Sequence, residues 1–88
     1  MPSVDADIRN RIVTLVTSIL AQNAIAAEVT GEVPLVDIGL TSMDMVNLML
    51  AVEVEFDLTI PQAEITPENF QSPESIERLV SRQIDVAA

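Results

Sequence analysis

Apolar residues recur with helical spacing in three separate stretches of this chain, and that recurrence limits its fold more than any other feature. In the first and last stretches, the apolar positions fall on one face of a helix with 3.6 residues per turn. The middle stretch consists of good helix formers without Gly or Pro. Before the last stretch, Pro67 follows Thr66 in the manner of a helix start, which predicts one short further helix. The four helices are expected at residues 4–23, 42–56, 66–70 and 73–84.

No segment shows the two-residue alternation of a strand, so the sequence predicts an all-α fold. We expect a small four-helix bundle of three longer amphipathic helices and one short one. The chain has 88 residues, and a single domain over residues 1–88 fits that length. Segment 24–40 loses the helical period and holds two glycines and a proline, which predicts a long ordered connection. Leu35 and Ile38 are expected to anchor this connection inward.

The helix expected at residues 42–56 has two apolar faces. One stripe contains Met45, Leu48, Met49, Val52 and Phe56, and the other contains Met43, Val46, Leu50 and Val54. Both stripes could be core if the helix were central, but a bundle this small can fully bury only one of them. We expect the stripe that ends at Phe56 to face the core. The stripe that begins at Met43 is then partly exposed, as a docking surface rimmed by acidic residues.

Negative charge dominates the chain, with 14 acidic against 4 basic residues and a formal net charge of −10. Nine of the acids, and none of the bases, lie in residues 36–77. Such a charge disfavours nucleic acid and anionic lipid, so protein partners with basic surfaces are expected. A solvated face that only aids solubility is the alternative. With no apolar run of about 20 residues and no secretory signal pattern, we expect a cytoplasmic monomer without stable membrane insertion.

The residue types that most enzymes use are missing. The chain has no Cys, His or Lys, which excludes disulfides, thiolate chemistry and the Ser-His and Ser-Lys nucleophile pairs. Glu53 and Asp57 lie one turn apart, but such pairs usually belong to a solvated helix face. Asp37 and Asp44 lack the spacing of a calcium loop. The sequence therefore predicts no catalytic residues, no metal site and no enzyme.

Ser42 has a setting that suits a covalently attached anion. The segment DIGLTSMD, residues 37–44, places it at a helix N-terminus after a glycine-containing turn. Backbone N–H groups and the helix dipole favour negative charge at such a position. A simpler role is also open, because Ser42 or Thr41 can serve only as the N-cap of the helix.

The pattern as a whole resembles the acyl carrier protein and peptidyl carrier family, whose members bear a phosphopantetheine arm on a serine in a D-x-G-x-x-S-[LM] setting. The matching residues are Leu35, Asp37, Gly39, Leu40, Ser42, Met43 and Asp44, together with FDLTIP at 56–61 and ITPENFQS at 65–72. The resemblance implies that a phosphopantetheinyl transferase modifies Ser42 from coenzyme A. It also implies that the arm holds an acyl group as a thioester for partner enzymes, so that Ser42 is a substrate and not a catalyst.

The resemblance further implies that the helix at 42–56 is the principal recognition element. The residues assigned to partner recognition are Asp37, Met43, Asp44, Val46, Asn47, Leu50, Glu53 and Val54. The implied partners are the transferase and acyl-activating, synthase or acyltransferase enzymes with basic docking surfaces. The main hypothesis is a specialised, free-standing acyl carrier for fatty acid, lipid or polyketide-type biosynthesis. The alternatives are an aminoacyl or peptidyl carrier and, in another class, an unmodified acidic helical adaptor.

Four residues of this region depart from the common family pattern. Thr41 precedes the serine where many relatives have Asp, and Met43 follows it where Leu is more frequent. Asn47 and Val54 stand where carriers of fatty acid synthesis usually have acids. The docking face is therefore expected to be less acidic and more apolar than theirs, which favours a carrier with partners of its own.

Overall fold

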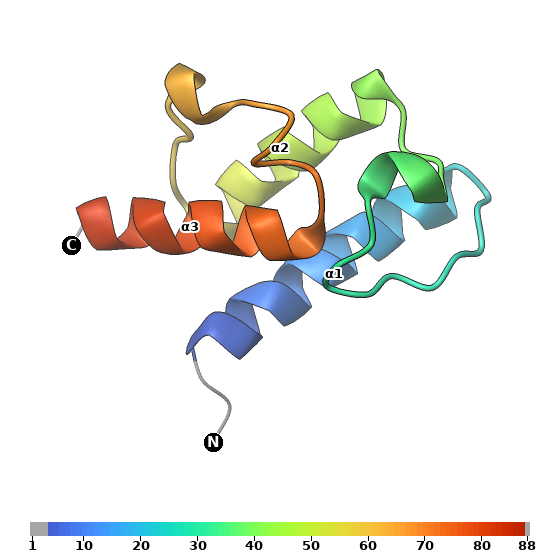
Figure 1. Cartoon of the computed structure of the whole chain (residues 1–88), viewed down its shortest axis with the longest axis horizontal. Helices are drawn as coiled ribbons and strands as arrows, with labels where there is room; N and C mark the ends of the chain where they lie inside the picture. The colour runs from blue at the N-terminus through green and yellow to red at the C-terminus, as the bar shows by residue number, and fades with distance from the viewer. Residues whose placement is uncertain (1–3, 88) are drawn as a thin grey trace.

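Three α-helices and two short 3-10 turns form the part of the chain that the structure describes (Figure 1). The structure is a computed structural model, and it describes the backbone of residues 4–87 and the side chains of residues 7–84. The helices are α1 (Val4–Gln22), α2 (Ser42–Phe56) and α3 (Pro73–Ala87), and the 3-10 turns are η1 (Leu35–Ile38) and η2 (Gln62–Glu64). Residues 4–87 contain no strand, so the all-α prediction is confirmed.

The expected count of four helices is not confirmed. Residues 67–70 form a turn where a short helix was expected at 66–70, and the nearest 3-10 turn lies earlier, at η2. The Thr66 hydroxyl does accept a hydrogen bond from the Asn69 N–H over 3.2 Å, as in a helix start. Only one turn forms because α3 begins at Pro73, which leaves no room for another. The bounds of α2 match the prediction, α1 ends one residue earlier than expected, and α3 continues three residues beyond 84.

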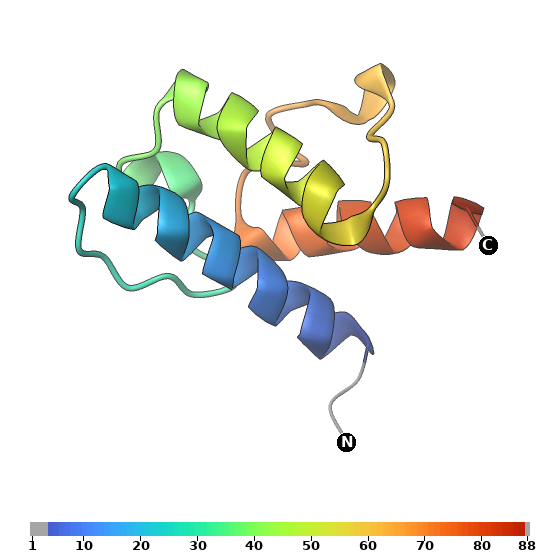
Figure 2. The ribbon, with the colours of Figure 1, turned by 180° about the vertical axis from the view of Figure 1, so that it is seen from behind.

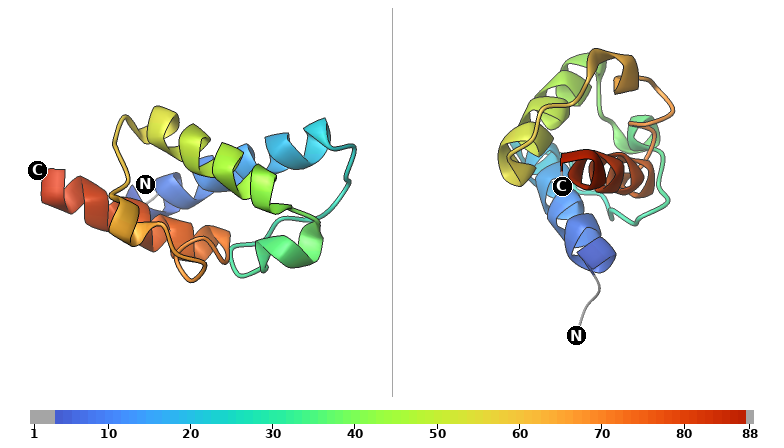
Figure 3. Two further views of the ribbon diagram at one scale, coloured as in Figure 1. Left: turned by 90° about the horizontal axis from the view of Figure 1, so that it is seen from above. Right: turned by 90° about the vertical axis from the view of Figure 1, so that its left-hand side faces the viewer.

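The helices enclose one apolar core, to which the connections also contribute. α1 contacts both other helices. Figure 2 shows it beside α2, and Figure 3 shows α3 nearly end-on with α1 and α2 to one side. The buried apolar residues are Ile8, Ile12, Val16, Ile19, Leu20, Leu35, Leu40, Leu48, Val52, Ile60, Phe70, Ile76, Leu79 and Val80. Leu35 is fully buried and Ile38 packs partly buried against the core, so the inward anchoring of the connection is confirmed.

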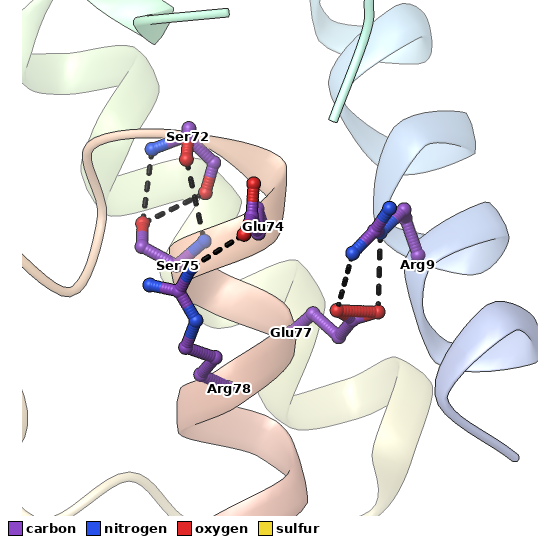
Figure 4. A network of polar contacts seen from close by, with 6 residues as sticks. All are labelled: Arg9, Ser72, Glu74, Ser75, Glu77 and Arg78. Atoms are coloured by element: carbon purple, nitrogen blue, oxygen red, sulfur yellow. Dashed lines mark hydrogen bonds and ion pairs between the residues drawn. The ribbon is translucent and has the colours of Figure 1, made fainter. Parts of the chain in front are cut away.

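Backbone hydrogen bonds tie the long connection between α1 and α2 to the start of α3. The Glu74 N–H donates to the Gly31 carbonyl and the Leu35 N–H donates to the Gln71 carbonyl, each over 2.8 Å. At the same end, Ser72 and Ser75 exchange hydrogen bonds between their hydroxyls and backbone N–H groups, which caps α3 before Pro73 (Figure 4). These bonds fix the connection, and with it the approach to α2.

All four arginines form ion pairs with acids of the central acidic segment. The pairs are Arg9–Glu77 at 2.9 Å, Arg11–Glu55 at 2.6 Å, Arg82–Glu64 at 3.5 Å, and Arg78–Glu74. The negative charge of residues 36–77 is thus partly neutralised by bases that lie outside that segment in the sequence. Within residues 4–87, no helix combines the length and apolar character needed to cross a lipid bilayer.

Candidate functional site

A left-handed glycine turns the chain from η1 into α2. Gly39 has φ of 107°, a conformation that side chains disfavour, and its N–H donates to the Val36 carbonyl over 3.3 Å. A Cβ atom at this position would lie 3.0 Å from Cδ1 of Ile25. The backbone conformation therefore favours glycine here, whereas the close contact would need only a small shift of the end of the Ile25 side chain. The tight turn brings residues 41 and 42 to the start of α2.

A capping box closes the N-terminus of α2. Thr41 is the N-cap, and its hydroxyl accepts a hydrogen bond from the Asp44 N–H over 3.2 Å. The Thr41 N–H donates back to Oδ2 of Asp44 over 2.9 Å, and the side-chain amide of Asn23 donates to the same oxygen over 3.0 Å. These two donors lower the pKa of Asp44 below its ordinary value, because they stabilise the charged carboxylate. The Thr41 N–H has the larger effect and the Asn23 amide the smaller one.

Ser42 is the first residue of α2 and is exposed. Thr41 takes the capping role that the sequence left open between the two residues. Among the side chains of residues 7–84 and the backbone of residues 4–87, the Ser42 hydroxyl has no hydrogen-bond partner. A hydroxyl that is exposed, uncommitted and placed at the positive end of a helix dipole fits a phosphate-linked group.

A cleft of about 650 Å³ lies beside Ser42, between α2 and the segment that follows η2. Its volume is within the range of small-molecule sites. The lining residues are Val36, Ser42, Met45, Val46, Met49, Ile65, Thr66, Pro67, Glu68, Phe70 and Gln71. Most are apolar. Ser42 thus adjoins a cleft large enough for a group of small-molecule size.

The two faces of α2 have the environments that the sequence predicts. On the first stripe, Leu48 and Val52 are fully buried, and the other members pack partly buried against the core. The second stripe is solvent-accessible, with exposed fractions of 69% for Met43, 48% for Val46, 50% for Leu50 and 83% for Val54. We call these four residues the exposed stripe. Its exposure is confirmed, whereas its role in docking stays a prediction.

The expected acidic rim is changed by the structure, because all three acids of α2 serve the fold. Asp44 is buried and caps the helix, so it does not join the exposed stripe. The Glu53 carboxylate accepts a hydrogen bond from the Ile60 N–H over 2.8 Å, and Glu55 pairs with Arg11. α2 therefore presents an apolar and largely uncharged face.

Other residues assigned to recognition lie around this face. Asn47 is exposed on α2, and Asp37 is exposed in η1. Sequence reasoning missed two exposed apolar residues that line the cleft with Ser42, namely Val36 in η1 and Ile65 after η2. Both lie in connections without helical periodicity, so no stripe pattern marked them. With Val46 of the exposed stripe, they line the same cleft as Ser42.

Comparisons with known proteins agree with this geometry. A family model described as a phosphopantetheine attachment site matches residues 10–80. Two proteins of Bradyrhizobium diazoefficiens are similar along nearly the whole chain. One is named aminoacyl carrier protein 1 and is 64% identical over 99% of this chain and 97% of its own length. The other is named aminoacyl carrier protein 2 and is 54% identical over 96% of this chain and 94% of its own length.

Two solved structures are also similar. One is described as Bradyrhizobium japonicum glycine:[carrier protein] ligase complexed with glycylated carrier protein, and the matched chain is 71% identical with a TM-score of 0.72. The match covers 82% of this chain and 97% of that chain. The other is described as the same ligase with its cognate carrier protein and an analogue of glycyl adenylate, with 70% identity and a TM-score of 0.75. It covers 86% of this chain and 99% of that chain.

Proposed function

The chain belongs to the family of phosphopantetheine-bearing carrier proteins, and from that premise we propose that it carries an aminoacyl group on an arm attached to Ser42. The protein is a carrier and not an enzyme, and covalently attached phosphopantetheine is its cofactor. When bound, this group supplies a terminal thiol that holds the cargo as a thioester. The chain itself supplies the hydroxyl, its position and the surface that partners recognise.

The uncommitted hydroxyl of Ser42 is the observation that supports this attachment site most directly. The Thr41–Asp44 capping box caps the N-terminus of α2 without the Ser42 hydroxyl. Esterification of Ser42 therefore breaks no hydrogen bond to a described residue. Because Ser42 is exposed on a rigid helix, a transferase can reach it without unfolding the site. The activating base must come from that enzyme, because this chain has no His or Lys.

The comparisons favour an aminoacyl cargo, which was the alternative, over the acyl cargo of the main hypothesis. An acyl carrier of fatty acid, lipid or polyketide-type biosynthesis was expected first, with an aminoacyl carrier second. Both curated relatives are named aminoacyl carrier proteins, and a similar solved chain belongs to a complex with a glycylated carrier. We therefore assign an aminoacyl cargo, with glycine as the first amino acid to test.

The proposed partner is an ATP-dependent amino acid ligase that docks on the exposed stripe next to Ser42. Because the acids of α2 are engaged by Thr41, Ile60 and Arg11, we infer an apolar contact in place of the basic docking surface that the charge suggested. Burial of apolar side chains then supplies most of the binding energy. Asn47 is exposed on the same helix and Asp37 is exposed in η1, and both remain part of the proposed recognition surface. The cytoplasmic, monomeric state expected from the sequence also remains part of the proposal.

Intact-protein mass spectrometry tests the assignment in two steps. After incubation with a broad-specificity transferase, coenzyme A and Mg²⁺, the chain should gain one phosphopantetheine. The Ser42→Ala protein should not gain this mass. The Ser18→Ala protein, which changes an exposed serine of α1 instead, should still gain it. Modification of the Ser42→Ala protein, or none of the wild type, contradicts the attachment site. In the second step, the mass of the carrier purified from its host distinguishes an aminoacyl from a fatty acyl thioester.

A further inference from the structure

One carboxylate lines the cleft beside Ser42. Among the lining residues, Glu68 is the only one with an ionisable side chain, and it is exposed. Met45, Met49 and Phe70 supply apolar lining. The cleft therefore combines an apolar wall with a single negative charge.

Glu68 differs from the acids before and after it in having no partner. Glu64 pairs with Arg82, and Glu74 pairs with Arg78. The side chain of Glu68 forms no hydrogen bond and no ion pair with the side chains of residues 7–84 or the backbone of residues 4–87. Glu68 lines both this cleft and a second cavity, which Arg78 and Arg82 also line, and its carboxylate is available to a ligand.

The backbone that carries Glu68 is held in place. The Thr66 hydroxyl accepts a hydrogen bond from the Asn69 N–H, and the Asn69 side chain donates to the Glu64 carbonyl over 2.7 Å. Phe70 is buried in the core two residues after Glu68. These contacts fix the backbone on both sides of Glu68 and so keep this residue beside the cleft.

We propose that Glu68 accepts a hydrogen bond from the α-ammonium group of the aminoacyl cargo, and that the cleft is where this cargo rests between partner enzymes. The inference rests on the proposed function. A group tethered to Ser42 is present at the cleft at high effective concentration, so even a weak charged contact is populated. A simple acyl chain has no positive charge to offer Glu68. The pairing therefore distinguishes an aminoacyl cargo from an uncharged acyl group of the same size.

Glycyl and propionyl groups provide a matched test, because they differ in an ammonium in place of a methyl group. Isotope-labelled protein is loaded on Ser42 by a transferase from coenzyme A, glycyl-coenzyme A or propionyl-coenzyme A. NMR then follows the methyl groups of Met45 and Met49 and the side-chain carboxylate carbon of Glu68. We expect the methyl resonances to shift in both loaded forms relative to the unmodified protein. The Glu68 carboxylate resonance should shift only in the glycyl form.

Two variants locate the effect. Glu68→Gln keeps the size of the side chain and removes its charge, and it should make the methyl shifts of the glycyl form equal to those of the propionyl form. Glu28→Gln, at an exposed residue outside the cleft lining, should leave the difference unchanged. Equal Glu68 shifts in both forms, or methionine resonances that do not move on loading, overturn the inference. Absence of any mass gain at Ser42 instead contradicts the proposed function, so the two failures are separable.

Discussion

Thr41 and Asp44 close the start of α2 by two reciprocal hydrogen bonds, from the Thr41 N–H to the Asp44 carboxylate and from the Asp44 N–H to the Thr41 hydroxyl. Ser42 lies between them in the sequence and takes no part in either bond. From the sequence alone, either Thr41 or Ser42 could have capped the helix. The structure assigns the cap to Thr41. Thr41 stabilises the helix, and Ser42 is left for chemistry.

This division predicts that Thr41 and Ser42 affect stability differently. Thr41→Ala should lower the free energy of unfolding by about 1 kcal/mol because it removes the cap. Ser42→Ala should change it by less than about 0.5 kcal/mol, as for an exposed residue without partners. Urea denaturation measures both, with Thr59→Ala as a control at an exposed threonine. A loss for Ser42→Ala as large as that for Thr41→Ala would show that the serine hydroxyl also caps the helix.

Acid should weaken the protein partly through Asp44. Its pKa is lowered in the folded state, mainly by the Thr41 N–H and then by Asn23, so the folded state favours the charged carboxylate. The resulting stability is present above the pKa of the unfolded chain and is lost as the pH falls through the lower pKa of the folded protein. Asp44→Asn should therefore reduce stability at pH 7 and flatten its decline in acid. Asn23→Ala should have an intermediate effect, and identical acid profiles for all three proteins would contradict the assignment.

The sequence predicted local features of the fold well and long-range contacts poorly. The bounds and the two faces of α2 followed from periodicity and composition, which depend on neighbouring residues. The expected helix at 66–70 failed because Pro73 starts α3 too soon after it. The engagement of Glu53 by the Ile60 N–H depends on how the chain folds back after α2, which no spacing reveals.

In the candidate site, too, local features could be predicted from the sequence and long-range contacts could not. Ser42 and the exposed stripe could be identified from sequence, since both rest on motif and periodicity. The burial of Asp44 and the neutralisation of Glu55 could not be identified from sequence, because their partners are distant in the chain: Asn23 follows α1 and Arg11 lies in it. The structure thus gives the acids of α2 roles in the fold that the sequence did not indicate, and an acidic docking rim stays a prediction.

An apolar docking face predicts a particular response to mutation. Leu50→Asp should raise the ligase KM for the carrier at least tenfold, a loss of about 1.4 kcal/mol, because it places a charge in the contact. The free energy of unfolding should change little, since Leu50 is 50% exposed. Leu48→Ala, at the fully buried neighbouring position, should instead lower that free energy by about 2–5 kcal/mol. Unchanged loading of Leu50→Asp would place the docking surface elsewhere.

The same face predicts a weak dependence of docking on salt. Contacts between exposed charges are screened over about 8 Å at physiological ionic strength, whereas apolar burial is not screened. We expect the KM for the carrier to vary by less than about threefold between 50 and 500 mM NaCl, with electrostatic steering accounting for the remainder. A steep rise in KM with salt would indicate that carboxylates such as Asp37 bind a basic partner surface after all.

The Arg9–Glu77 ion pair between α1 and α3 should contribute more to stability than any other ion pair of the described residues. Figure 4 shows Arg9 directed from α1 toward Glu77, with two hydrogen bonds of 2.9 and 3.2 Å to its carboxylate oxygens. The Glu77 side chain is only 9% exposed, so Arg9→Met leaves a nearly buried carboxylate without its partner. That change should lower the free energy of unfolding by about 1–3 kcal/mol, while Arg78→Met, at an exposed pair, should cost less than about 1 kcal/mol.

A double-mutant cycle tests whether the stability lost in Arg9→Met arises from the Arg9–Glu77 ion pair. Replacing Glu77 with Leu in the Arg9→Met protein removes the unpaired charge and should recover most of the stability, because a buried ion pair often exchanges with apolar residues at little cost. The cycle should therefore give a coupling energy between Arg9 and Glu77 of about 1 kcal/mol or more. Additive effects would contradict this, and would mean that Arg9 stabilises the protein through packing of its aliphatic stem.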